Sequence, residues 1–283
     1  MSHHHDDDHD DFGGLHRDLT ATGFAMGRRQ ALRKALGATA FGMGALALLG
    51  CADTSVTGAD ASTGTDTTGG TGATGGSCSL VTPETAGPYP GDGSNGANVL
   101  NLTGVVRQDI RTSFAGLSGT AAGVPLTIKL TLVSAATCEV LSDYAVYLWH
   151  CDALGRYSLY SSGATNQNYL RGVQAADATG QVTFTSIYPG CYSGRWPHIH
   201  FEVYRSVAAA TKVANKIATS QIALPKGASD VVYAQAGYTG SASNLSRITL
   251  ATDNVFSDGS ALELATVTGN VTDGYVATLT VAV

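Results

Sequence analysis

The feature that most limits the possible folds of this chain is a series of short segments in which apolar and polar residues alternate. A period of two places successive side chains on opposite faces of an extended strand. Turns rich in Gly, Asp and Ser separate these segments, and the pattern predicts an all-β fold, a β-sandwich with few short helices. Short helical turns are expected within residues 207–218 and 228–235. The alternating segments are residues 126–133, 182–184, 201–204 and 275–281.

The first 50 residues have the layout of an export signal. Arg28 and Arg29 precede an apolar run at residues 35–49, which is typical of twin-arginine signals for proteins that fold before transport. The run is short for a membrane span, which takes about 20 apolar residues. It ends in the residues LLGC, which resemble a bacterial lipoprotein signal, so we expect the mature chain to begin at a lipidated Cys51. A free cysteine at an ordinary cleavage site is the alternative.

This leader predicts an exported, lipid-anchored protein in the periplasm or at the cell surface. Because Ala52 is not the aspartate that favours inner-membrane retention, the outer membrane is the predicted destination in a Gram-negative host. Residues 51–77 are mostly Thr, Gly, Ser, Ala and Asp, which cannot bury a core and predict a flexible tether. Residues 78–283 are predicted to form the single folded domain, after an extension and signal at residues 1–50.

The composition agrees with one β-rich domain and argues against a nucleic-acid partner. Of the 283 residues, 43% are hydrophobic and 13% are charged, which is ample for one core with flexible segments beside it. The net charge is −6, without the basic excess that binding to a phosphate backbone requires.

Two histidines near the middle of the predicted domain indicate a metal site. His198 and His200 alternate with Ile199, so in a strand both imidazoles lie on the same face and can bind one ion. Five of the eight histidines precede the apolar run of the leader, which leaves only His150 besides this pair. We expect His150, at the end of an apolar strand, to be a hydrogen-bonded structural residue.

The residues around this pair favour ferric iron over other metals. No Asp or Glu is close in sequence to complete a usual zinc or ferrous site, whereas a tyrosinate oxygen is a hard anionic donor that suits Fe(III). Tyr192 is the first candidate donor. Tyr157 is the second, because an apolar strand at residues 145–149 leads into the glycine-containing loop that carries it. A cation stabilises the phenolate, so a bound tyrosine ionises far below its usual pKa of about 10.

Four segments, taken in order, resemble the intradiol ring-cleavage dioxygenases, in particular an exported twin-arginine lipoprotein subgroup. That family uses a β-sandwich, binds one ferric ion through two tyrosines and two histidines, and cleaves catechol-type diols with O2 to cis,cis-muconate-type diacids. The resemblance implies Tyr157, Tyr192, His198 and His200 as the iron ligands. The segments are residues 82–89 (TPETAGPY), 149–158 (WHCDALGRYS), 187–192 (IYPGCY) and 195–200 (RWPHIH).

The resemblance also implies roles for three residues. Tyr192 matches the axial tyrosine that leaves the iron and accepts a proton from the diol. Arg195 matches the family's active-site arginine, whose charge stabilises anionic character on the ring, and Gln221 matches a pocket glutamine. The Tyr192–Arg195 loop is shorter than in the catechol and protocatechuate enzymes, so the substrate pocket is expected to differ from theirs. Their helical dimerisation segment has no counterpart, so any oligomer is expected to use another surface.

Four cysteines follow Cys51, and an even set in an exported domain predicts two disulfides with three possible connectivities. If Tyr157 and Tyr192 reach one metal, the nearby Cys151 and Cys191 are brought together. We therefore expect one disulfide between these two and another between Cys78 and Cys138.

Two other functions are compatible with the same leader and sandwich. The first is a non-catalytic surface lipoprotein that binds sugars or a protein partner. The second is a hydrolase with a different metal on His198 and His200.

Overall fold

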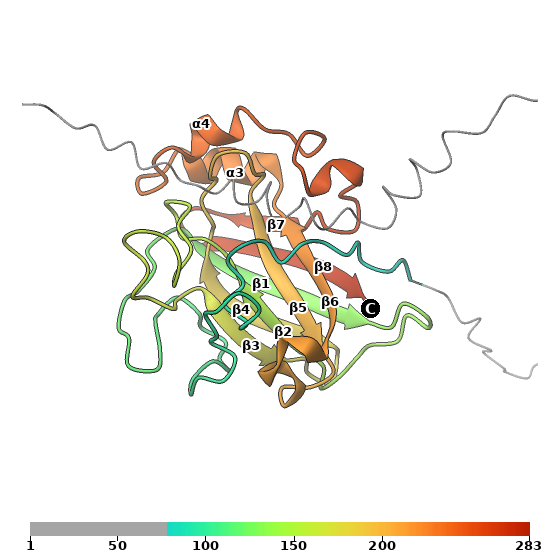
Figure 1. Cartoon of the computed structure of the whole chain (residues 1–283). Helices are drawn as coiled ribbons and strands as arrows, with labels where there is room; N and C mark the ends of the chain where they lie inside the picture. Colours follow the sequence, from blue (N-terminus) through green and yellow to red (C-terminus); the bar gives the residue numbers. More distant parts are fainter. Residues whose placement is uncertain (1–77) are drawn as a thin grey trace, which may run out of the picture. The chain divides into compact units, whose positions relative to one another are not determined.

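The computed structural model describes residues 78–283 as two four-stranded sheets stacked on each other (Figure 1). The predicted twin-arginine signal, the predicted lipidation of Cys51 and the predicted tether lie outside the described residues. One sheet has the order β4-β1-β8-β7 and the other the order β3-β2-β5-β6. The strands are β1 (Pro125–Val133), β2 (Ala145–Trp149), β3 (Arg171–Ala175), β4 (Gln181–Ile187), β5 (His198–Tyr204), β6 (Lys216–Ala223), β7 (Thr266–Asn270) and β8 (Gly274–Ala282).

Neighbouring strands are antiparallel except β1 and β8, which are parallel. The predicted all-β sandwich is confirmed, and the period-two pattern explains its core. In β1 the alternate residues are buried between the sheets, where they meet apolar side chains from β4, β2 and β5. The core residues from these strands include Leu126, Ile128, Leu130, Leu132, Phe184, Leu148, Ile199 and Phe201.

Strands β2 and β5 are buried along their whole length, on both faces. Their second face carries large aromatic and polar side chains, including Tyr147, Trp149, His200 and Tyr204, and is covered by loops. This outer face, rather than the sandwich core, is where polar groups can be held away from water.

The helices are short and lie at both ends of the sandwich (Figure 1). They are η1 (Ala209–Thr211), η2 (Val213–Asn215), α3 (Lys226–Tyr233), α4 (Ser241–Leu245) and η3 (Phe256–Asp258). The first three correspond to the predicted helical turns, whereas α4 and η3 had no clear sequence signal. Helices α3 and α4 lie together at the end where β6 finishes and β5 begins (Figure 1). No helix within residues 78–283 is long and apolar enough to cross a membrane.

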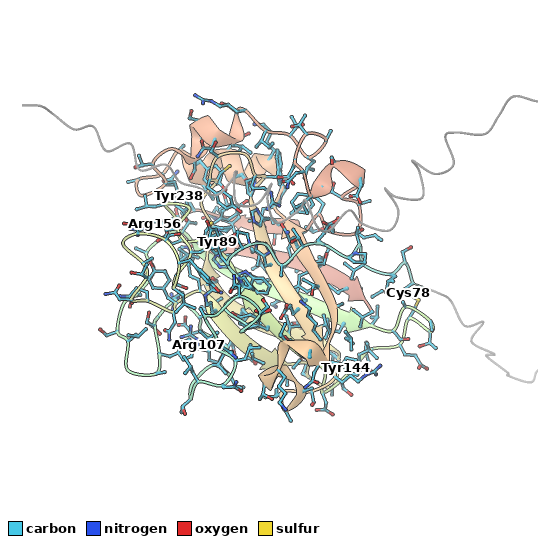
Figure 2. The ribbon with its side chains drawn as sticks, viewed as in Figure 1. Cys78, Tyr89, Arg107, Tyr144, Arg156 and Tyr238 are labelled. Carbon is cyan, nitrogen blue, oxygen red and sulfur yellow. A yellow bond between two sulfur atoms is a disulfide. The ribbon has the colours of Figure 1, made fainter. Side chains whose placement is uncertain are left out.

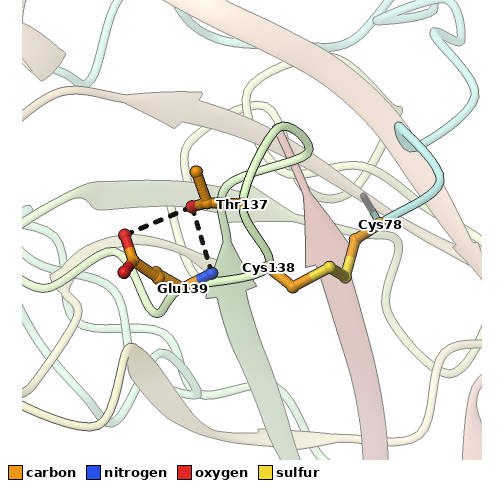
Figure 3. The surroundings of a disulfide bond; sticks show 4 residues. All are labelled: Cys78, Thr137, Cys138 and Glu139. Carbon is orange, nitrogen blue, oxygen red and sulfur yellow. Dashed lines mark hydrogen bonds between the residues drawn. A yellow bond between two sulfur atoms is a disulfide. The ribbon is translucent and has the colours of Figure 1, made fainter. Parts of the chain in front are cut away.

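One of the two predicted disulfides is present. Cys78 and Cys138 are bonded, which ties the first described residue to the turn after β1 (Figure 3). The predicted bond between Cys151 and Cys191 is wrong, because both are buried free thiols. Each sulfur lies against a main-chain carbonyl, Cys151 Sγ 3.4 Å from Gly190 O and Cys191 Sγ 3.4 Å from Arg195 O. The Cys151 contact joins the two loops, whereas the Cys191 contact lies within its own loop.

The predicted structural role of His150 is confirmed. Its Nδ1 lies 2.7 Å from the carbonyl oxygen of Cys151, and its Nε2 lies 2.7 Å from Ser186 Oγ on β4. Burial lowers the pKa of His150 to about 4, so the ring is neutral and links the two sheets by hydrogen bonds.

Candidate metal centre

Strand β5 begins with the two histidines of the predicted site. Because β5 alternates, His198 and His200 point to the outer face of the sheet, while Ile199 and Phe201 point into the core. His200 pairs with Trp149 on β2 and with Gln221 on β6. Residues directly opposite each other in an antiparallel pair share a face, so these three side chains form a row beneath the loops.

Two loops bring the tyrosines to the same place. The hydroxyl oxygen of Tyr157 lies 3.2 Å from His198 Nε2, and that of Tyr192 lies 3.1 Å from the same nitrogen. The His198 and His200 rings are 4.8 Å apart between centroids, and the Tyr157 ring is 6.1 Å from that of His200. The structure therefore brings together all four residues predicted from the sequence.

The loops meet at a glycine. A Cβ atom at Gly190 would lie 2.5 Å from Ala153 O and 2.9 Å from Gly155 N, both main-chain atoms of the Tyr157 loop. Gly190 N also donates a hydrogen bond to Asp152 O at 3.0 Å. Only glycine permits this approach of the segments that carry Tyr157 and Tyr192.

Burial sets the protonation states of this cluster. Tyr157, His198 and His200 are at most 3% exposed, whereas Tyr192 is only partly buried. Burial lowers the pKa of both imidazoles well below 6.5, and the charge of Arg195 lowers that of His198 further. Burial also raises the pKa of the Tyr157 hydroxyl well above 10, and the nearby Tyr192 side chain raises it further. Without a cation Tyr157 and the two histidines are therefore neutral, and the imidazole lone pairs are available to bind one.

The donor set fits a ferric ion. His198 Nδ1 lies 2.5 Å from Trp196 O and donates to it, which leaves Nε2 as the unprotonated nitrogen facing the tyrosines. The single lone pair of His198 Nε2 cannot accept full hydrogen bonds from both tyrosine hydroxyls. Metal-ligand atoms that surround one ion at about 2.0–2.2 Å lie about 3 Å from each other, which is the spacing seen here. Within residues 78–283 no three His, Cys, Asp or Glu side chains are arranged to hold a metal. A metal here therefore needs the phenol oxygens, which favours Fe(III).

His200 is oriented by stacking rather than by a hydrogen bond. Its Nδ1 is buried without a hydrogen-bond partner, as is Nε1 of Trp149. The two rings are nearly parallel, with an interplanar angle of 6° and centroids 5.0 Å apart. The ring of Trp149 is therefore the support of this imidazole.

Arg195 and Gln221 lie beside the cluster and bond to each other. Arg195 Nη2 donates to Gln221 Oε1 at 2.7 Å, and Arg195 Nε donates to Asp253 Oδ2 at 3.0 Å. Arg195 and Asp253 are 1% and 0% exposed at their side chains, so this ion pair is fully buried. Asp253 lies 58 residues from Arg195 in a segment without a motif, and sequence reasoning missed it.

Residues 82–91, called the strap below, cover the site. Gln221 Nε2 donates to Thr85 O at 2.9 Å. The ring of Tyr89, which is labelled in Figure 2, lies 4.9 Å from that of Tyr157. The strap includes the first of the four segments that resemble the intradiol dioxygenases. The sequence assigned no role to Tyr89, because nothing local shows which ring it contacts.

Comparisons with known proteins agree with this geometry. A family model described as Dioxygenase matches residues 102–214, a range that contains Tyr157, Tyr192, His198 and His200. The solved structure of an intradiol ring-cleavage dioxygenase from Tetranychus urticae superposes with a TM-score of 0.58 and 24% identity, covering 72% of this chain and 94% of that one. This chain has the fold of the intradiol ring-cleavage dioxygenases.

A second structure, described as dioxygenase Tetur07g02040, gives a TM-score of 0.56 with 24% identity and the same coverages of 72% and 94%. A comparison with curated proteins finds no match.

Proposed function

We propose that this protein is a ferric intradiol dioxygenase that cleaves catechol-type aromatic diols with O2 to cis,cis-muconate-type diacids. Tyr157, Tyr192, His198 and His200 would hold the Fe(III). The observation that carries the proposal is the convergence of two phenol oxygens on one neutral imidazole nitrogen, in a buried site of an intradiol-type fold. Bound Fe(III) would supply a Lewis acid and a template that makes the diol reactive toward O2.

The two tyrosines differ in burial, and this difference separates their roles. Tyr157 is enclosed by the strap and by the loop that carries it, so its oxygen stays in place. Tyr192 is partly exposed. A diol that binds as a dianion must release two protons, and the Tyr192 oxygen is the accessible group that accepts one of them.

Arg195 supplies a fixed positive charge beside the reacting ring. Its Nε–Asp253 bond and its Nη2–Gln221 bond hold the guanidinium in one orientation. A charge oriented before the reaction stabilises anionic character without reorganisation, which is the most effective form of electrostatic catalysis. The strap excludes water from the same space, because it spans the site from Thr85 to Tyr89.

Colour and product formation test the proposal together. Iron-loaded protein should show a broad visible tyrosinate-to-iron band that shifts when a diol is added without oxygen. Oxygen uptake with a panel of catechols, together with product ultraviolet spectra, then identifies the substrate. A protein that stays colourless at full iron occupancy would rule out tyrosinate ligation, as expected for a zinc hydrolase or a non-catalytic binding protein.

Two matched variants separate the tyrosines. Tyr157→Phe should release iron faster, whereas Tyr192→Phe should retain iron and bind and turn over the diol slowly. Tyr144→Phe is the control, because its hydroxyl accepts a bond from the exposed Arg205 side chain away from the cluster. Full turnover by Tyr192→Phe would contradict the proposed role of this residue as the base.

We also propose that the protein is exported by the twin-arginine route and anchored through a lipid on Cys51, with residues 51–77 as a tether. The support is the sequence of the leader. Replacing Arg28 and Arg29 by lysine should trap the precursor in the cytoplasm. Unchanged export of this variant would contradict the route.

A further inference from the structure

Arg171, the first residue of β3, is a buried arginine bonded to five acceptors, and no carboxylate is among them. Its side chain is 1% exposed. Nε donates to Ser158 Oγ at 3.0 Å, and Nη2 donates to Ser158 O and to Tyr89 O, each at 2.9 Å. Nη1 donates to Pro90 O at 2.7 Å and to Tyr147 Oη at 3.2 Å. A guanidinium keeps its charge when buried, so these are all charge-assisted bonds.

These bonds join three segments that carry the candidate metal centre. Ser158 follows Tyr157 directly, so two of the bonds hold the loop that presents this tyrosine. Tyr89 and Pro90 belong to the strap. Tyr147 is on β2, where its own hydroxyl donates to Pro90 O at 2.7 Å. The guanidinium is thus the common partner of the strap, the Tyr157 loop and the sheet.

Arg171 also occupies a defined place in the sheet. It pairs with Trp149, which pairs with His200, which pairs with Gln221. The row of four side chains runs across the outer face of all four strands beneath the strap. Gln221 at one end bonds the Thr85 carbonyl, and Arg171 at the other end bonds the Tyr89 and Pro90 carbonyls. The strap is therefore fastened on both sides of the cluster.

The fit of the strap to this guanidinium is close. Gly91 has a φ of 63°, and a Cβ atom there would lie 2.8 Å from Arg171 Nη1. The ring of Tyr160 lies beside the same guanidinium, 5.5 Å from Cζ to centroid, and its hydroxyl accepts a bond from Gly91 N at 2.9 Å. The charge of Arg171 is one of the causes that lower the pKa of His200, after burial, His198 and Arg195.

We propose that Arg171 is a positioning residue for the metal centre, holding the Tyr157 loop and the strap in the single arrangement that places the Tyr89 ring against Tyr157. The iron readouts of this inference rest on the proposed function. The readout on the strap does not, because it is made on metal-free protein.

The test compares Arg171→Met and Arg171→Lys with wild type in the full chain. Hydrogen exchange of metal-free protein, followed by mass spectrometry, should show peptides covering the strap and Ser158 exchanging about tenfold or more faster in Arg171→Met, as expected when charge-assisted bonds are lost. Peptides from β1 and β4 should be unchanged. Iron release to a chelator should accelerate by about the same factor, with Arg171→Lys intermediate because it keeps the charge but not the planar fork.

Arg107→Met is the matched control. Arg107 also donates to main-chain carbonyls, including Arg171 O at 3.0 and 2.7 Å, but none of its bonds goes to the strap or the Tyr157 loop. Equal acceleration of strap exchange in Arg107→Met and Arg171→Met would overturn the inference, as would unchanged exchange and iron release in a folded Arg171→Met.

A second variant keeps the test decisive if Arg171→Met does not fold. Ser158→Ala removes the Nε acceptor, together with the hydrogen bond that Ser158 Oγ donates to Tyr169 O at 2.8 Å, but keeps the Ser158 carbonyl that accepts from Nη2. It should accelerate iron release and exchange of the Tyr157 loop with little effect on the distant strands. Unchanged behaviour of Ser158→Ala would then overturn the inference. A wild-type protein that binds iron without colour would defeat the proposed function, while the strap exchange would still decide the role of Arg171.

Discussion

Removing the charge of Asp253 should remove much of the free energy of unfolding of this domain, although Asp253 belongs to none of the sequence motifs. Its carboxylate accepts Arg195 Nε and Trp196 N through Oδ2, and Val255 N and Phe256 N through Oδ1. Asp253→Asn keeps the volume, so no cavity contributes. It leaves the buried Arg195 charge without its carboxylate and turns an amide donor toward groups that are themselves donors.

The magnitude follows from burial. Breaking a buried pair by removing one charge costs about 3–5 kcal/mol, because the remaining charge stays desolvated. Domains of this size have a free energy of unfolding of about 5–15 kcal/mol, so the loss is a large fraction of the total. The matched control is Asp230→Asn, which removes the same charge from the Lys226–Asp230 pair. That pair is 2.7 Å long but 58% and 51% exposed, and should contribute at most about 0.5 kcal/mol.

Urea unfolding of both variants, followed by tryptophan fluorescence, measures the difference directly. Trp196 is buried and bonded to the carboxylate of Asp253, so its emission reports on this region. The urea concentration at the unfolding midpoint should shift about six times more for Asp253→Asn than for Asp230→Asn. The slope of the unfolding free energy against urea concentration should not change. Similar shifts in the two variants would refute the reasoning that burial, rather than the ion pair itself, sets the cost.

Three further predictions concern other parts of the domain. Reducing the Cys78–Cys138 disulfide, which spans 60 residues, should lower the free energy of unfolding by about 4 kcal/mol, measured by urea titration with and without reductant. Gly190→Ala should destabilise the protein and weaken iron retention because its Cβ meets main-chain atoms, whereas Gly227→Ala in α3, with open space around it, should be neutral or slightly stabilising. Burial, followed by the charge of Asp258, raises the pKa of Glu263 to about 8, so between about pH 4.5 and pH 8 this carboxyl is protonated in the folded protein and ionised in the unfolded chain. The stability that Glu263 contributes is therefore complete below about pH 4.5 and is lost as the pH rises through about 8. Glu263→Gln should flatten the decline of stability between about pH 5 and pH 8, and an unchanged pH profile would contradict this.

Much of the fold could be predicted because its signals are local. Alternation in β1 and β5 reflects the two faces of a strand, which every residue in extended conformation obeys. The same rule placed His198 and His200 on one face before any partner was known. The disulfide between Cys78 and Cys138 was also anticipated, but its companion was not. Whether two nearby thiols point at each other depends on side-chain directions within a packed loop, and Cys151 and Cys191 point at carbonyls instead.

The sequence by itself determined the sheet pattern, the pair of imidazoles and the phenols available as anionic donors. Only the tertiary structure decided which distant residues hold them in place. Asp253, Tyr89 and Arg171 reach the site through contacts across 58 to 82 residues of chain, and no local pattern marks such contacts. The physical reason is that strand periodicity arises from the covalent geometry of neighbouring residues, whereas buried ion pairs and hydrogen bonds form only when packing brings desolvated groups together.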